Sequence, residues 1–569
     1  MIKEGCQNCK SEFIIEDEDL DFYKKIDVPP PTFCPDCRFQ RRMAWRNERA
    51  LYKRTCSLCQ KNTISMYPAE ATFPVYCREC WYSDKWDAIE YGLDYDFSKN
   101  FFEQLKTLSA LVPRMAIWQR NVVNSEYSNM TGESKNVYLS ASVVANCENI
   151  FYSKAIDSSF NIVDSYNIKN SDNCYKNIDG ERNYNSKYLV FSRDCIDSSF
   201  LYDCSNCKNC FMSANLQNKD YHIRNKPLTK EKYFEELKKI NFGSRKEMDF
   251  LRREFEELQK QAIHKYANNI KCIDSTGNNL TNTKKAEQCF DIYDTENTKY
   301  CYRGFSLKDC MDFDYGANSE LMYEYTTGAK DDYNVKFSYS AMNNVSDAEY
   351  TESCQGASSL FGCISIRNKE NVILNKVYQE AEFKRLRKEI IAHMNKNTFI
   401  GKHGRTYAYG EFLPIELSPV AYNESQAYDF YPLTEEEALD MGYRWHKAQE
   451  KGYKASILAA EIADDIKSVD KKILQETLAC AHDGSCNHTC QKAFRVIPDE
   501  LAFYQNNEVP LPDLCPNCRF YNNFEKVLPP KLWHRKCLRN GCPNEFETSY
   551  APDRPEIVYC EQCYQSEVV

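Results

Sequence analysis

The residues with the clearest chemical potential are cysteines, which stand in pairs near both ends of the chain. Of the 29 cysteines among 569 residues, eight lie in the first 80 residues and eight from residue 486 onward. A Cys-x-x-Cys turn places two thiolates about one edge of a metal tetrahedron apart, and two such turns complete a closed four-cysteine zinc site with no open position for catalysis. We therefore expect four structural zinc ions, which would supply folding energy to segments too small for a core of their own.

The expected ligands form two sets at each end of the chain, and the intervals of 25, 19 and 18 residues between successive pairs are the same at both ends. The sets are Cys6, Cys9, Cys34 and Cys37; Cys56, Cys59, Cys77 and Cys80; Cys486, Cys490, Cys515 and Cys518; and Cys537, Cys542, Cys560 and Cys563. The Cys486/Cys490 and Cys537/Cys542 pairs are wider than Cys-x-x-Cys. Cys480, His482 and His488 lie beside the third set, so its first ligand stays open between these residues and Cys486. An iron–sulfur cluster and redox thiols are the alternative interpretations.

The text around the cysteines is also duplicated. FYKKIDVPPPTFCPDCRF at Phe22–Phe39 corresponds to FYQNNEVPLPDLCPNCRF at Phe503–Phe520. This motif order resembles the zinc-ribbon domain family of small bacterial and plant proteins, over residues 6–42 and 486–520. With VYCRECWYSDKWD at Val75–Asp87 and SYAPDRPEIVYCEQCY at Ser549–Tyr564, most of the chain resembles large uncharacterised proteins of candidate-phylum bacteria, in which paired zinc ribbons flank a Cys- and Tyr-rich repeat. That resemblance implies no established activity.

A basic segment separates the first two cysteine sets. It holds Trp45, Tyr52 and a single acid, Glu48, and its basic residues are Arg38, Arg41, Arg42, Arg46, Arg49, Lys53 and Arg54. Basic groups interleaved with aromatic rings are what phosphate neutralisation and base stacking require, so these residues are predicted to bind RNA or DNA. The alternative is a helix that joins two zinc sites, its charge balanced by the thiolates and by residues 16–19. The net charge of −10 argues against a generally polybasic coat protein.

Between residues 118 and 372, strand-like pieces of three to five residues alternate with Asn, Asp and Ser turns. Ile156–Phe160 recurs as Ile196–Phe200, 40 residues later, which we interpret as two coils of about 20 residues. The sequence predicts a mainly β protein with helices: an irregular right-handed parallel β-helix in two modules, flanked by double zinc-ribbon ends. The twelve cysteines of this region, Cys204, Cys207 and Cys210 among them, are expected to form a ladder of small buried residues rather than a metal site.

The remaining segments connect or cap these parts. The expected order is zinc ribbons at 1–42 and 43–90, a helical linker at 91–117, β-helix modules at 118–226 and 269–375 with helical caps at 227–268 and 376–396, an extended linker with short helices at 397–479, and zinc ribbons at 480–522 and 523–569. In the first cap, Met248, Leu251 and Phe255 fall on one helical stripe. A partner-binding coiled coil is the alternative for that helix.

No catalytic motif stands out, and no apolar run is long enough for a membrane helix. Five aspartates (Asp157, Asp164, Asp172, Asp179 and Asp197) leave a carbohydrate-active β-helix enzyme as one alternative, although Asp is also a routine turn residue. With no secretory signal, we expect a cytoplasmic protein with reduced thiols. The prediction is a non-catalytic, zinc-binding scaffold for a macromolecular partner, either a nucleic acid at the basic segment or a protein along the solenoid, without a membrane or small-molecule substrate.

Overall fold

The computed structural model describes residues 1–340, 343–447 and 454–569. They form two compact units, each built from separate segments of the chain. The first unit contains residues 1–118, 267–447 and 530–532, and the second contains residues 119–266, the described part of 448–529, and 533–569. Each unit therefore combines one solenoid module with the cysteine sets from one end of the chain. The N-terminal sets belong with the second module, and the C-terminal sets with the first.

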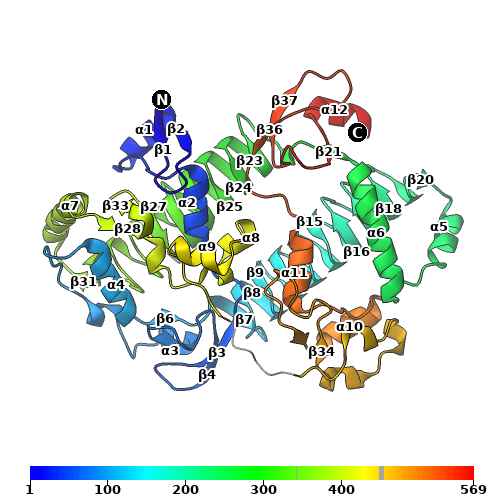
Figure 1. The fold of residues 1–569 in the computed structure, drawn as a ribbon, viewed down its shortest axis with the longest axis horizontal. Coiled ribbons are helices and arrows are strands. Elements are labelled where there is room, and N and C mark those ends of the chain that lie inside the picture. The colour runs from blue at the N-terminus through cyan, green and yellow to red at the C-terminus, as the bar shows by residue number, and fades with distance from the viewer. Residues whose placement is uncertain (341–342, 448–453) are drawn as a thin grey trace. The chain divides into compact units, whose positions relative to one another are not determined.

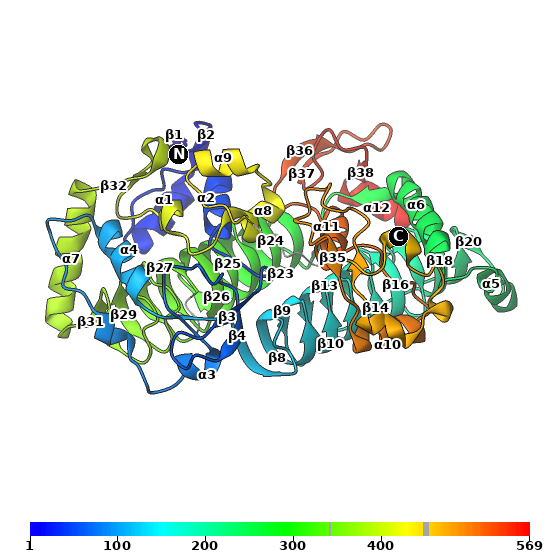
Figure 2. The same cartoon turned by 60° about the horizontal axis from the view of Figure 1, so that its bottom comes forward.

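The predicted fold class is confirmed, since the described chain is mainly β, with 34% strand and 24% helix, and each unit contains a parallel β-solenoid. In the second unit the solenoid strands are β7 (Gln119–Val123), β8 (Asn129–Tyr138), β9 (Ala141–Val144), β10 (Glu148–Phe151), β11 (Lys154–Asp157), β12 (Phe160–Val163), β13 (Tyr166–Lys169), β14 (Asp172–Tyr175), β15 (Ile178–Glu181), β16 (Tyr184–Val190), β17 (Ser199–Tyr202), β18 (Lys208–Ala214) and β19 (Asp220–Ile223). The antiparallel strand β20 (Lys226–Pro227) closes this sheet. Figure 2 shows the coils from β8 to β18 stacked side by side.

The solenoid of the first unit is built in the same way. Its strands are β22 (Asn269–Ile270), β23 (Gly277–Glu287), β24 (Cys289–Lys299), β25 (Tyr302–Glu320), β26 (Tyr323–Lys330), β27 (Tyr333–Tyr339), β28 (Ser346–Glu349), β29 (Ser358–Phe361) and β30 (Glu370–Ile373). The antiparallel strand β31 (Lys376–Val377) closes it, as β20 closes the other.

The length of one coil is 12 residues, because Ile150 pairs with Ile162 and Ile162 pairs with Cys174 on neighbouring coils. Every third residue has a positive φ, as at Asn161 (53°) and Asp164 (51°), so a coil consists of four three-residue segments that each end in a left-handed bend. Asn and Asp tolerate this conformation better than other non-glycine residues, which explains their abundance in the repeat.

The predicted coil length of about 20 residues is wrong, because the 40-residue text recurrence on which it rested is not a multiple of 12. Ile156 points into the solenoid and is fully buried, whereas Ile196, its counterpart in the text, is 38% exposed. The similar text therefore occupies different positions on the coil. The coils are also irregular as predicted, since Lys135 pairs with Glu148 across a 13-residue coil. The extra residue lies at Ala145–Asn146, where both φ angles are positive.

Small polar side chains inside the solenoid satisfy the backbone at its corners. The Ser165 backbone N–H donates to Ser153 Oγ (3.0 Å), and this hydroxyl donates to the Phe151 carbonyl (2.9 Å). The cysteines occupy equivalent inward positions: the Cys195 thiol lies 3.3 Å from the Arg193 carbonyl, two residues back. Eleven of the twelve solenoid cysteines are buried and Cys272 is half-buried. The arrangement is the ladder of small buried residues that the sequence predicts.

Helices cover both solenoids. In the second unit α5 (Lys230–Leu237) contacts the terminal strand β19, while α6 (Arg245–Gln261) lies along β17 and β18 (Figures 1 and 2). In the first unit α7 (Glu380–Lys396) contacts the terminal strand β30. The stripe of Met248, Leu251 and Phe255 on α6 is buried in the same core cluster as Phe200 of β17, so the apolar face of α6 covers its own solenoid.

The cysteine-rich ends consist of hairpins and short helices. The N-terminal elements are β1 (Ile2–Gly5), β2 (Glu12–Ile15), α1 (Asp17–Lys25), α2 (Pro35–Met43), β3 (Tyr52–Thr55), β4 (Asn62–Ser65), β5 (Val75–Tyr76), α3 (Arg78–Trp81), α4 (Phe101–Leu111) and β6 (Arg114–Met115). The C-terminal elements are β34 (Leu478–Ala479), β35 (Ala493–Phe494), α10 (Pro498–Asn506), α11 (Pro516–Phe524), β36 (Trp533–Lys536), β37 (Glu545–Thr548), β38 (Ile557–Tyr559) and α12 (Glu561–Val568). The strand β38 pairs in parallel with β21 (Ile263–Lys265).

Between α7 and β34 the chain forms β32 (Phe399–Ile400), β33 (Thr406–Tyr407), α8 (Gln426–Phe430), α9 (Glu435–Asp440) and several short 3₁₀ turns. Within the described ranges, every helix is too short or too polar to cross a lipid bilayer.

Candidate metal centres

The first two cysteine sets come together in the first unit as two groups of four thiols. In each group the four sulfur atoms lie within 4.8 Å of one another. Cys9 and Cys34 Sγ are 3.7 Å apart, and Cys59 and Cys77 Sγ are 3.9 Å apart. A zinc tetrahedron with Zn–S bonds of about 2.3 Å has edges of about 3.8 Å, whereas a disulfide bond measures about 2.05 Å. The spacing therefore fits sulfur atoms arranged around one metal ion.

The same local geometry builds every group. The first cysteine follows a hairpin strand, and the third caps the N-terminus of a helix, as Cys34 does for α2. The backbone N–H of this helix-capping cysteine lies close to the sulfur of the first: Cys34 N to Cys6 Sγ is 3.3 Å, and Cys77 N to Cys56 Sγ is 3.2 Å. Such N–H···S bonds orient a thiolate ligand and lower its negative charge.

In the third group the structure differs from the predicted ligand set, because Cys480 occupies the place expected for Cys486. Cys480 lies with Cys490, Cys515 and Cys518, within 4.8 Å of one another. The Cys515 backbone N–H lies 3.2 Å from Cys480 Sγ, which repeats the contact seen in the other groups. The prediction relied on near-constant spacing, but nine residues lie between Cys480 and Cys490, whereas two lie between Cys6 and Cys9.

The position of a strand would have identified Cys480. It directly follows β34, as Cys6 follows β1, and Cys490 lies three positions before the start of β35, as Cys9 lies three before the start of β2. Both copies contain the same hairpin strands, but the loop between them is longer in the C-terminal copy. The flanking strands therefore identify the ligands better than the cysteine spacing does.

The fourth group contains the four predicted residues, Cys537, Cys542, Cys560 and Cys563. Cys542 and Cys560 Sγ are 3.9 Å apart, and the Cys560 N–H lies 3.3 Å from Cys537 Sγ. The Cys537–Cys542 turn is two residues longer than Cys-x-x-Cys, yet it still places both sulfur atoms in the group. Among the residues that the structure describes, four groups of four cysteines have a geometry that could hold a metal ion.

Neighbouring thiols alter one another's acidity. Hydrogen bonds with Cys34 and Cys37 lower the pKa of Cys6, whereas hydrogen bonds with Cys37 and Cys6 and burial raise the pKa of Cys34. Without a metal, some thiols of the group thus remain protonated and donate hydrogen bonds to neighbouring thiolates. A divalent cation would displace those protons, so metal affinity should fall as the pH falls.

The basic segment after the first group is mostly buried, which corrects the expectation that it forms an exposed nucleic-acid surface. Arg38 and Arg42 of α2 are at most 1% exposed. Arg38 Nε donates to Asp312 Oδ2 (2.8 Å), and Arg42 donates to Asp314 Oδ2 (2.6 Å) and to Asp312 Oδ1 (3.0 Å). Figure 1 shows α2 close to the solenoid strand β25 that carries both aspartates. These guanidinium groups clamp the N-terminal zinc-type end to the solenoid of its unit.

Apart from Lys53, the other predicted nucleic-acid residues are also engaged within the protein. Arg41 is 2% exposed and donates to Glu411 Oε2 (2.9 Å), and Arg46 is 3% exposed and donates to Glu48 Oε1 (2.7 Å). Arg49 pairs with Asp429, and Arg54 donates to the Pro68 carbonyl. Lys53 is exposed. Trp45, the aromatic ring expected to stack on bases, is buried against Tyr339 and Phe412.

The C-terminal copy uses the same clamp. Arg519 follows Cys518 as Arg38 follows Cys37, and its NH1 group donates to Asp164 Oδ2 (3.1 Å) and Tyr504 Oη (2.8 Å). Asp164 and Asp312 both occupy left-handed positions of a coil, with φ of 51° and 53°. Sequence reasoning missed both pairings with arginine, because nothing in the local text of Asp312 marks it as the partner of an arginine 274 residues away.

The five aspartates that suggested a polysaccharide enzyme each have a local role. Asp164 accepts from Arg519, and Asp157 accepts from the Ser158 hydroxyl. The other three accept from asparagine side chains in adjacent coils: Asp172 from Asn161, Asp179 from Asn167 and Asp197 from Asn185. They are thus members of amide ladders and ion pairs on successive coils.

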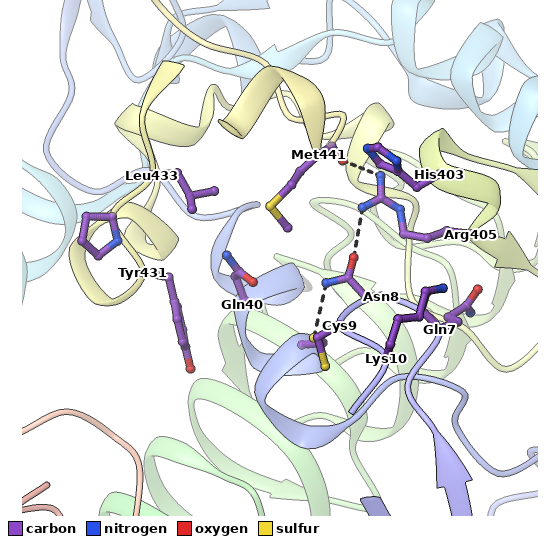
Figure 3. Close-up of a pocket in the computed structure, with 12 residues that line it drawn as sticks. Gln7, Asn8, Cys9, Lys10, Gln40, His403, Arg405, Tyr431, Leu433 and Met441 are labelled. Carbon is purple, nitrogen blue, oxygen red and sulfur yellow. Dashed lines mark hydrogen bonds between the residues drawn. The ribbon is translucent and has the colours of Figure 1, made fainter. Parts of the chain in front are cut away.

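A cavity of about 470 Å³ opens beside the first cysteine group. Figure 3 shows Asn8, Cys9, His403 and Arg405 around it, with Met441 and Tyr431 supplying apolar walls. Arg405 donates to Asn8 Oδ1 (3.2 Å), and Asn8 Nδ2 lies 3.3 Å from Cys37 Sγ. Cys9 is the exposed thiol of its group, so this centre is the one that solvent or a reagent in the cavity would reach first.

Neither a protein-family model nor a curated protein sequence matches this chain. The description of the centres therefore rests on their sulfur geometry, on the repeated N–H···S contact and on the buried arginine clamps.

Proposed function

We propose that this protein is a non-catalytic scaffold, stiffened by structural zinc, that presents its solenoid surface to a protein partner. The observation that carries the proposal is the pairing of closed four-sulfur groups with buried arginines: Arg38 joins the first group, and Arg519 the third, to the solenoid of its own unit. A metal with four protein ligands has no free position for a substrate, so its natural role is to hold structure. A rigid repeat is suited to recognition through an extended surface.

A column of large apolar side chains on the second unit offers a surface for that partner. Phe160, Tyr184 and Ile196 lie on coils of one face, in the register Phe160, Asp172, Tyr184, Ile196. They are 43%, 52% and 38% exposed. At about 4.8 Å per coil the column spans about 14 Å. Large exposed apolar side chains that gather on one face are typical of protein interaction sites.

A protein partner is favoured over a nucleic acid by the state of the basic segment. Arg38, Arg41, Arg42 and Arg46 are buried in ion pairs, and Trp45 is buried as well. Phosphate binding at this segment would require the loss of these pairs. The column contains Asp172 and is bordered by Glu148 and Lys208, so it has the mixed character of a protein-binding surface rather than a phosphate-binding one.

The test places a photo-cross-linking amino acid at Tyr184 and, as a matched control, at Phe305, which is 50% exposed on the first unit. We expect one protein to be captured from cells through position 184 and not through position 305, and Phe160→Glu with Ile196→Glu to abolish its binding. Equal capture at both positions would reject the column as the partner surface.

A second measurement addresses the nucleic-acid alternative. Titration of the purified, zinc-loaded protein with RNA and with DNA at 50 and 200 mM salt should detect no specific, salt-sensitive binding. Tight binding that weakens steeply with salt and is reduced by Lys53→Ala would reject the protein scaffold in favour of a nucleic-acid-binding one.

A further inference from the structure

The third cysteine group contains more ligands than one metal ion can use. The loop between Cys480 and Cys490 is seven residues longer than the loop between Cys6 and Cys9, and it carries His482, Cys486 and His488. The short loop of the N-terminal copy consists of Gln7 and Asn8 and has no such residues. The insertion thus adds three candidate metal ligands to a complete four-cysteine group.

These three residues converge on a sulfur of that group. His482, Cys486, His488 and Cys518 place their donor atoms within 4.8 Å of one another. Cys486 Sγ lies 3.6 Å from Cys518 Sγ, which is the length expected for one edge of a metal tetrahedron. Cys518 Sγ also lies 3.8 Å from Cys480 Sγ and 3.5 Å from Cys515 Sγ. The sulfur of Cys518 therefore belongs to two adjoining sets of four donors.

The two imidazoles are oriented as metal ligands are. Nδ1 of His482 and Nδ1 of His488 are both buried without a hydrogen-bond partner, a state that costs free energy unless another ligand is bound. His488 Nε2 lies 3.2 Å from Glu525 Oε1, and its ring stacks on Tyr521 at 5.4 Å between centroids. A ligating histidine commonly donates its second N–H to a carboxylate, which fixes the ring and leaves the first nitrogen for the metal.

We propose that a second zinc ion binds His482, Cys486, His488 and Cys518, and that the Cys518 thiolate bridges it to the zinc of the four-cysteine group. The chain would then hold five zinc ions, with a binuclear centre at one end and no counterpart in the N-terminal copy. Two imidazoles and two thiolates are a usual structural zinc set. The second dication would also offset the negative charge that four thiolates leave around the first.

The test is the zinc content of the full-length protein, measured by mass spectrometry of the metal after gel filtration. We expect five zinc ions per chain in the native protein and four in the His482→Ala/His488→Ala variant. The matched control is His534→Ala, which removes an exposed histidine paired with Glu545 and Glu547 and should keep five. Because the altered residues lie in the inserted loop, the four-cysteine group remains intact in the double variant.

Other zinc contents would distinguish a failure of the fifth zinc site from a failure of the proposed zinc-stabilised scaffold. Four zinc ions in both the native protein and the double variant would overturn the fifth site while leaving the zinc-stabilised scaffold in place. Fewer than three in the native protein would overturn both. The bridge has its own readout: in protein loaded with cadmium-113, two of the five resonances should be split by coupling through the shared Cys518 sulfur. Five unsplit resonances would overturn the bridging thiolate.

Discussion

Arg42 of α2 donates its Nε–H to Oδ2 of Asp314 on β25 across 2.6 Å, and neither side chain is exposed to solvent. Burial raises the pKa of Asp314 to about 7, although the charge of Arg42 favours the ionised carboxylate. The two residues are 272 positions apart in the chain. This pair joins the helix of the first cysteine group to the solenoid. Breaking it would leave an uncompensated charge in the protein interior, which costs more free energy than the loss of an apolar contact of α2.

Replacing Arg42 should therefore be costly. In the variant Arg42→Met, Asp314 and Asp312 lose a buried cation, and we expect the free energy of unfolding to fall by about 3–5 kcal/mol. Chemical denaturation followed by tryptophan fluorescence measures this change. Arg49→Met is the control, since its pair with Asp429 is partly exposed and should contribute at most about 1 kcal/mol. Equal losses in the two variants would contradict the clamp.

The two classes of cysteine should differ in their effect on metal content. Cys56→Ser removes a ligand from a four-sulfur group and should lower the zinc content by one ion per chain. Cys207→Ser changes a buried rung of the solenoid ladder, where its thiol lies 3.4 Å from the Ser205 carbonyl, and should leave the zinc content unchanged. Both contents are read by metal mass spectrometry. Loss of metal from the Cys207 variant would show that the ladder binds metal after all.

The beginning of β23 depends on a glycine. Gly277 has a φ of +142°, and a Cβ atom there would lie 1.8 Å from the backbone oxygen of Cys289 on the next coil. Gly277→Ala should destabilise the first unit by on the order of 3 kcal/mol or more, because the obstructing atom belongs to a paired strand.

Gly328→Ala is the control for the glycine test. Its φ is +84° but open space surrounds the added carbon, so only the backbone strain of about 1 kcal/mol should be measured. Thermal unfolding of the two variants gives the comparison. Similar melting temperatures would mean that the coils adjust at Gly277.

The 12-residue coil can be tested with two isoleucines that occupy the same position in similar text. Ile156 is fully buried inside the solenoid, and Ile196 is 38% exposed. Ile156→Asn leaves an amide and a cavity in the core and should cost about 3–5 kcal/mol, whereas Ile196→Asn should change stability by about 0.5 kcal/mol at most. Denaturation midpoints measure both. Equal costs would favour a repeat that superimposes the two segments.

Acid should destabilise the second unit through His264. This side chain is 3% exposed, its Nε2 lies 3.0 Å from the Gln259 carbonyl, and its Nδ1 faces the Tyr202 hydroxyl. Burial lowers its pKa from 6.5 to about 4. Between these values the unfolded chain binds a proton that the folded chain rejects, so stability is complete above pH 6.5 and is lost as the pH falls toward 4. The loss at pH 5 should be about 2 kcal/mol.

His264→Gln removes the titrating group and should reduce the stability difference between pH 7.5 and pH 5 by that amount. His222→Gln, in β19 of the same unit, serves as the control and should keep the native pH dependence. Comparing variants at each pH cancels the loss of metal in acid, which all of them share. An unchanged pH dependence in the His264 variant would contradict a neutral buried imidazole.

How well the candidate metal centres could be predicted from the sequence depended on how far apart along the chain their ligands lie. Cys6 and Cys9 lie on one turn, so their spacing reports geometry directly, and the same holds for Cys34 and Cys37. Cys480 was assigned less well, because a long inserted loop breaks the link between spacing and position. The abundance of Asn and Asp predicted turns and a solenoid. The length of one coil was predicted wrongly from a short recurring segment, because similar segments can occupy different positions on the coil.

The sequence by itself determined that the chain is a β-solenoid with paired cysteine knuckles at its ends, because these features arise from residues a few positions apart and from a repeated pattern. Only the tertiary structure decided that the arginines after Cys37 face inward rather than outward. The sequence around an arginine on a helix does not show whether its side chain faces solvent or a buried carboxylate. The partner of Arg38, Asp312, lies 274 residues away in the chain. The same holds for Cys518, whose place between two donor sets follows from how the loop before Cys490 folds against α11, a helix that begins only at Pro516.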